Sequence, residues 1–154
     1  MIITEIRDEN QKSQYSKEVL RELPEWFGNE TSLCQYVSDV RKFPYWAAID
    51  ENGKCIGFIS IKTHYDHTGD IYVIGILPEY HREGIGRKLY ASAEEYLILN
   101  KYRYVIVKTL SEKAQYEPYE KTRKFYLSIG FEPLITLTEM WDVENPCLIM
   151  IKVL

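Results

Sequence analysis

The spacing of apolar and polar positions divides the chain into short strands and amphipathic helices. Apolar residues recur at helical spacing in four segments, which we expect to be helices: 11–23, 31–40, 84–100 and 120–129. Runs rich in β-branched and aromatic residues predict seven strands: 1–6, 45–49, 55–61, 71–77, 104–110, 131–138 and 147–153. The order is therefore strand, two helices, three strands, helix, strand, helix and two strands.

The chain is organised around the stretch 70–89, which reads as strand, turn and helix. Gly75 interrupts the apolar run of the strand, and an isolated glycine there suggests a bulge or a close approach of another backbone. Pro78 ends the strand, because it has no amide hydrogen for the ladder. The strand 104–110 is continuously apolar, as in buried parallel sheets, so the three elements predict a right-handed βαβ unit.

The turn between this strand and helix has the features of an anion site. Gly84 and Gly86 have no Cβ atoms, so a ligand can come close to the backbone. The first amides of a helix lack acceptors and lie at the positive end of its dipole, where phosphate commonly binds. Arg82, Arg87 and Lys88 add positive charge. Neither common nucleotide motif fits: G-x-x-x-x-G-K-[ST] is absent, and G-x-G-x-x-G would need glycine where Leu89 stands.

Two connections contain residues of chemical interest. The polar segment 62–69 holds His64, Asp66 and His67, which suggest either a metal site or a solvated loop, and the lack of a nearby cysteine or fourth ligand favours the loop. A second loop is expected over 139–146, and it carries Trp141. The dipeptide Asn52-Gly53 predicts a hairpin between two earlier strands.

Composition narrows the class of protein. We expect 154 residues, 45% of them apolar, to form a single domain, 1–154. The net charge of −4 argues against binding to nucleic acid or to an anionic membrane, and no segment reads as a membrane span or signal peptide. Three widely spaced cysteines fit free thiols in a reducing cytoplasm.

Two motifs together resemble those of the GCN5-related N-acetyltransferase (GNAT) family. The first is an apolar strand, a proline and Gln/Arg-x-x-Gly-x-Gly/Ala before a helix, which here is His81-Arg82-Glu83-Gly84-Ile85-Gly86, with His81 as the departure. The second is aromatic-Tyr-x-x-x-Gly-Phe, which matches residues 125–131 some 40 residues later. Tyr119 stands where family members often have an asparagine that contacts pantetheine. The resemblance covers the whole chain.

The resemblance implies an α/β (α+β) fold with a mixed, mostly antiparallel sheet, a splayed parallel strand pair and flanking helices. It also implies acetyl-CoA as cosubstrate, with its pyrophosphate on main-chain amides of the turn. Ile76 would then pair with the pantetheine amide, and the N–H of Ile74 would point at the thioester oxygen. The implied cofactor-binding residues are Ile74, Ile76, His81, Arg82, Glu83, Gly84, Ile85, Gly86, Arg87 and Tyr126.

Tyr126 is the candidate general acid. A phenol with an ordinary pKa near 10 holds a proton at neutral pH and can give it to a departing thiolate, and family members use the tyrosine of this motif in that way. The alternative is that Tyr126 only packs under the cofactor sulfur. Asp70 matches the place where some family members have a carboxylate base; the alternatives are a solvated strand-end carboxylate and proton removal by water alone.

The resemblance leaves the acceptor amine open, as a small molecule, a peptide or a protein. The amine should enter opposite the cofactor, where Trp26, Tyr119 and Trp141 could surround it by cation–π contact or could simply pack. Dimers are common in the family, so a homodimer is a candidate assembly. The competing hypothesis is a noncatalytic acyl-CoA-binding regulatory module on the same fold.

Overall fold

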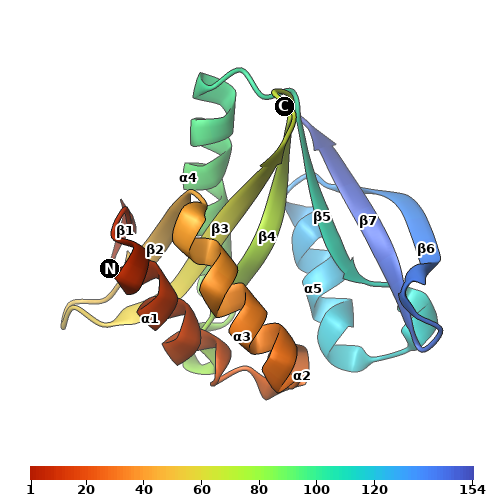
Figure 1. Ribbon diagram of the computed structural model, residues 1–154, viewed down its shortest axis with the longest axis horizontal. Helices are drawn as coiled ribbons and strands as arrows, with labels where there is room; N and C mark the ends of the chain where they lie inside the picture. The colour runs from red at the N-terminus through yellow and green to blue at the C-terminus, as the bar shows by residue number, and fades with distance from the viewer.

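One seven-stranded sheet forms the centre of the protein in the computed structural model, which describes residues 1–154. The strand order is β1-β2-β3-β4-β5-β7-β6, and every neighbouring pair is antiparallel except β4 and β5 (Figure 1). The strands are β1 (Ile2–Glu5), β2 (Tyr45–Ile49), β3 (Cys55–His64), β4 (Thr68–Ile76), β5 (Tyr104–Leu110), β6 (Glu132–Asp142) and β7 (Asn145–Val153). This confirms the expected mixed, mostly antiparallel sheet.

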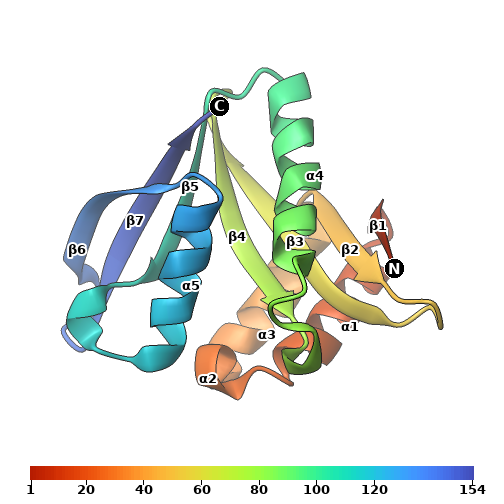
Figure 2. The ribbon, with the colours of Figure 1, turned by 180° about the vertical axis from the view of Figure 1, so that it is seen from behind.

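Helices cover both faces of the sheet. They are α1 (Glu9–Leu20), α2 (Pro24–Phe27), α3 (Glu30–Asp39), α4 (Ile85–Leu99) and α5 (Glu117–Ser128), with short 3-10 helices η1 (Val40–Lys42), η2 (Pro78–Tyr80) and η3 (Glu112–Ala114). Helices α1 and α3 lie on the face seen in Figure 1, and α4 and α5 lie on the opposite face, seen in Figure 2. No helix combines the length and the apolar character that crossing a membrane requires.

Helix α1 packs directly on β4 because Gly75 has no side chain. A Cβ atom at Gly75 would lie 3.2 Å from side-chain atoms of Val19 and Leu23. The glycine therefore marks a close approach, but side chains rather than another backbone come close to it. The other expectation, a bulge at Gly75, is wrong, since the register shift lies further back: Ser60 pairs with Val73 and Ile61 with Ile71, which leaves Tyr72 as the extra residue.

The parallel pair opens in the middle of the sheet. Its register runs only from Thr68↔Tyr104 to Ile71↔Val107, although β4 continues to Ile76 and β5 to Leu110. The two strands consequently splay apart and leave polar main-chain groups free along the second half of β4. This confirms the splayed pair that the motifs implied.

Two expected loops are mostly strand. The polar segment 62–69 extends β3 to His64 and begins β4 at Thr68, and the side chains of His64 and His67 bond to Asp70 and Thr68. The expected loop 139–146 is wrong as well, because β6 continues to Asp142 and β7 begins at Asn145. The Asp142 carboxylate closes that turn by accepting from the amides of Glu144 (3.0 Å) and Asn145 (2.9 Å).

Smaller differences concern helix ends and thiols. Helix α5 begins three residues earlier than expected, with Pro118 in its first turn, and α3 begins after Asn29, whose side chain accepts from the amide of Ser32 at 2.9 Å. The short helix α2 was not predicted. All three cysteines are free thiols, Cys34 exposed and Cys55 and Cys147 buried. The structure contains no group of three or more His, Cys, Asp or Glu side chains arranged to hold a metal.

Candidate active site

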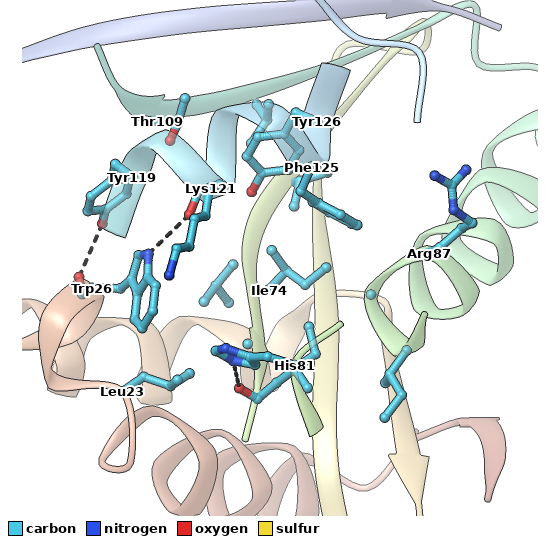
Figure 3. A pocket seen from close by; sticks show the side chains of 18 of the residues that line it. Leu23, Trp26, Ile74, His81, Arg87, Thr109, Tyr119, Lys121, Phe125 and Tyr126 are labelled. Carbon is cyan, nitrogen blue, oxygen red and sulfur yellow. Dashed lines mark hydrogen bonds between the residues drawn. The ribbon is translucent and has the colours of Figure 1, made fainter. Parts of the chain in front are cut away.

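A cleft of about 760 Å³ lies where β4 and β5 separate. Its walls come from α2, α3, β4, the turn before α4, β5 and α5, as the close view in Figure 3 shows. It therefore brings together the strand, the glycine turn and the second motif that the sequence singled out. Of the predicted site residues, the lining includes Ile74, Ile76, His81, Arg82, Gly84, Ile85, Gly86, Arg87 and Tyr126. Glu83 lies in the turn itself, and Asp70 does not line the cleft.

The turn before α4 presents free amides to the cleft. Gly84 has a φ of +79°, which glycine adopts without strain, and no side chain caps the helix. Lys88 donates the first main-chain hydrogen bond of α4, to Gly84 at 3.1 Å, so the amides of Ile85, Gly86 and Arg87 have no acceptor within the helix. These amides and the helix dipole form a site for an anion.

Gly86 lets the start of α4 pack closely against its neighbours. A Cβ atom there would lie 3.1 Å from the Phe125 ring and 3.4 Å from the Ile76 side chain. The first turn of α4 can therefore lie close to both β4 and α5. Because Ile85 beside it is buried in the core, the start of the helix is held in place.

The charge of the cleft is opposite to that of the chain. No Asp or Glu lines it, whereas five cationic residues do, although the net charge of the protein is −4. They are Arg82, Arg87, Lys108, Lys121 and Lys124. A concentration of positive charge in a concave site attracts anionic ligands.

The open edge of β4 offers donors and acceptors to an extended ligand. The Leu77 amide donates to the Ile56 carbonyl at 2.9 Å, toward β3. Because successive residues of a strand alternate in direction, the amides of Ile76 and Ile74 point away from β3, into the space between the splayed strands. His81 supports this direction, since its Nε2 donates to the Ile76 carbonyl at 2.7 Å from the cleft side.

Tyr126 is buried but reaches the cleft from α5. Only 4% of the residue is exposed, and its ring packs against Phe125 and Phe131 with centroid distances of 5.4 and 5.8 Å. Burial, followed by the nearby Tyr119, raises the pKa of its phenol well above the ordinary value of 10. Figure 3 shows the hydroxyl directed into the cleft. The group is thus a protonated phenol at any neutral or moderately alkaline pH.

Asp70 lies behind the cleft wall in an ion pair. It is only 3% exposed, which rules out the solvated strand-end carboxylate, and its Oδ2 accepts from His64 Nε2 at 2.7 Å and Lys108 Nζ at 3.3 Å. Lys108, which sequence reasoning did not single out, does line the cleft. The Asp70 carboxylate therefore does not line the cleft itself, whereas its partner Lys108 does.

Hydrogen bonds join α2 to α5 at one side of the cleft. Trp26 Nε1 on α2 donates to Thr122 Oγ1 at 3.0 Å and to the Pro118 carbonyl at 3.2 Å, and the Tyr119 hydroxyl donates to the Trp26 carbonyl at 3.2 Å (Figure 3). Burial raises the pKa of Tyr119 to about 12, so this donor keeps its proton. These bonds join residues more than 90 positions apart, which no local pattern reveals. Trp141 does not contribute as expected, because it lies on β6, 46% exposed and outside the cleft lining.

Comparison with known proteins identifies the class to which this fold and site belong. The chain belongs to the acetyltransferase (GNAT) family, whose model matches residues 3–131. This confirms the resemblance that the two motifs carry. No curated protein matches the chain in sequence.

Solved structures of the same fold are close in shape and distant in sequence. A GNAT-family protein from Desulfovibrio desulfuricans superposes with a TM-score of 0.82 at 16% identity, over 99% of both chains. An aminoglycoside 6'-N-acetyltransferase complexed with coenzyme A gives 0.79 at 20% identity, over 99% of this chain and 97% of that one. The aminoglycoside 6'-N-acetyltransferase from Enterococcus faecium gives 0.78 at 16%, with the same coverage. At such identities the likeness establishes the fold.

Proposed function

We propose that the protein is an acetyl-CoA-dependent N-acetyltransferase that transfers the acetyl group directly to a primary amine. The observation that carries this proposal is the continuity of the free amides at the start of α4 with the unpaired edge of β4 in one cationic cleft. A diphosphate followed by an extended amide arm fits that continuity. The complexes of related folds with coenzyme A and with acetyl coenzyme A support the assignment.

The cofactor would be held by the turn before α4 and by the open edge of β4. The amides of the turn 82–87 bind the diphosphate, with Arg82 and Arg87 beside them. The pantetheine arm then runs along β4 as an added strand, pairing with the main chain of Ile76. To do so it replaces His81 at the Ile76 carbonyl.

The chemistry needs a polarised carbonyl and a protonated leaving group. The Ile74 amide, directed into the gap, donates to the thioester oxygen and stabilises the negative charge that develops there; a single donor of this kind is typically worth about 3 kcal/mol. The neutral amine forms the new C–N bond, and the C–S bond then breaks. Tyr126 gives its proton to the departing thiolate, the amine loses a proton to water, and the Tyr126 phenolate regains a proton from the solvent. No covalent acetyl-enzyme is needed.

Thiol release over a panel of amines tests the proposal. With acetyl-CoA in excess, at least one primary amine should release free CoA with the matching N-acetyl product detected by mass spectrometry. Calorimetry should show acetyl-CoA binding to the same protein. Binding without transfer to any amine would favour the noncatalytic acyl-CoA-binding module, and the absence of binding would overturn both.

A further inference from the structure

Lys108 is the cation that β5 contributes to the cleft. Helix α5 packs against β5, where Val107 and Thr109 are buried, so these two side chains face α5 and Lys108 between them points to the opposite face of the sheet. Helices α1 and α3 lie on that opposite face (Figures 1 and 2). The anion-binding turn belongs to α4, on the α5 side. The Lys108 ammonium therefore lies on the side from which an acceptor enters, and 30% of its side chain is exposed.

Aromatic rings line the same side of the cleft. Phe27, Tyr36 and Tyr72 form a chain of edge-to-face contacts, with centroid distances of 5.6 Å for the first pair and 5.2 Å for the second. Burial raises the pKa of Tyr36, and of Tyr72 further, so both remain neutral. This wall suits a flat or apolar body and provides no negative charge.

Two carboxylates beside this wall already have hydrogen-bond partners. Asp39 accepts from the Tyr72 hydroxyl and from Gln35 Nε2 at 2.8 Å, and Asp70 accepts from His64 and Lys108. Neither lines the cleft. A polycationic acceptor, such as an aminoglycoside, loses water from its ammonium groups on binding. It would find no free carboxylate here to compensate for that loss.

We infer that the acceptor is an amino carboxylic acid with an apolar or aromatic body, whose carboxylate is bound by Lys108. The inference rests on the proposed transferase function and adds the substrate class to it. Lys108 donates one N–H to Asp70, and its two remaining N–H groups are available to an acceptor carboxylate. Asp70 holds the ammonium at this place on the wall.

The strand register places Lys108 at the start of the gap between the strands. Ile71 pairs with Val107 in the last pair of the parallel register, so Lys108 is the first residue of β5 beyond it. Its ammonium is bonded to Asp70, on the same stretch of β4 that leads to Ile74. A carboxylate bound by Lys108 would therefore lie in the same gap as an amine that approaches the Ile74 amide.

Matched pairs of acceptors test the inference. Phenylalanine and phenethylamine, or tyrosine and tyramine, differ only in the carboxylate, and kanamycin and spermidine represent polycations. We expect kcat/KM for the amino acid to exceed that for its decarboxylated partner by about tenfold or more, as a charge-assisted pair allows. Polycations should be poorer than either.

A charge-removing variant assigns the preference to Lys108. Lys108→Gln keeps an amide donor for Asp70 and removes the cation, so it should lower kcat/KM for the amino acid about tenfold and leave phenethylamine within about twofold. Lys62→Gln removes an exposed lysine from β3 outside the cleft and should change neither. Circular dichroism melting shows whether each variant is folded. Lys108→Arg keeps the positive charge and should retain most of the preference for the amino acid.

The outcomes separate this inference from the transferase function. If amines without a carboxylate, or polycations, are acetylated as well as the amino acids, the transferase stands and the substrate class is wrong. If Lys108→Gln affects both members of a pair equally, Lys108 does not bind the carboxylate. If acetyl-CoA binds and no amine of any class is acetylated, the proposed function itself fails, and this inference with it.

Discussion

The imidazole of His81 lies across the open edge of β4, with its Nε2 2.7 Å from the Ile76 carbonyl oxygen. The ring also makes an edge contact with Trp26, at a centroid distance of 5.8 Å. His81 thereby occupies the main-chain acceptor that the pantetheine arm is proposed to use. If the pantetheine arm binds as proposed, the residue that departs from the family motif has to give up this hydrogen bond when the cofactor enters.

The first prediction follows from this competition. His81→Ala should tighten acetyl-CoA binding roughly two- to tenfold in calorimetry, because the arm no longer displaces a hydrogen bond worth about 1 kcal/mol net. His67→Ala, which removes a histidine bonded to Thr68 outside the cleft, is the matched control and should leave the Kd unchanged. Equal or weaker binding by His81→Ala would show that the imidazole supports the cofactor.

The second prediction compares two glycines with the same backbone conformation. Gly84 and Gly53 have φ values of +79° and +81°, and a Cβ atom at either would meet nothing within 4 Å. Alanine at either position should therefore cost a similar amount of stability, roughly 1 kcal/mol, measured by denaturant unfolding. Only Gly84→Ala should weaken acetyl-CoA binding, by tenfold or more, since relief of the strain moves the amides of the turn. Intact affinity in Gly84→Ala would place the diphosphate elsewhere.

The third prediction concerns two buried tyrosines that both pack on Phe131. Tyr126→Phe should lower kcat about a hundredfold with little change in the KM for acetyl-CoA, because the proton donor acts on the leaving thiolate alone. Tyr90→Phe is the control: the Tyr90 hydroxyl is buried without a partner, so its removal should leave kcat unchanged. A kcat for Tyr126→Phe within a few-fold of the parent would leave Tyr126 as a packing residue.

The raised pKa of Tyr126 also predicts the pH dependence of the reaction. A general acid works only while protonated, and burial keeps this phenol protonated above its ordinary pKa of 10. The kcat of the parent protein should therefore not decline between pH 8 and about pH 10 through ionisation of this group. A decline in that range that is absent in Tyr126→Phe would show that Tyr126 is the titrating group and that its pKa is not raised.

Local patterns in the sequence predict much of this molecule. Gly84, Pro78 and the helical spacing after them indicated the strand, turn and helix, because turn chemistry and periodicity are local properties. The continuation of β6 to Asp142 was missed, since residues 138–142 do not alternate between apolar and polar and their strand state depends on the hairpin with β7. Three other features likewise arise from contacts between distant segments: the bulge at Tyr72, the hydrogen bonds from Trp26 to α5 and the burial of Asp70.

Asp70 gives the last prediction, because the sequence suggested a general base and the structure shows a buried ion pair. Asp70→Asn keeps an oxygen that can accept one hydrogen bond but leaves the Lys108 charge without its partner. The free energy of unfolding should fall by about 1–3 kcal/mol, the usual cost of a broken buried polar contact, discounted because Lys108 is partly exposed. With an amine that lacks a carboxylate, kcat should stay within about threefold of the parent value, since the carboxylate does not line the cleft. A fall of a hundredfold or more that is recovered at high pH, where the amine is already neutral, would instead show that Asp70 removes the proton through water or through Lys108.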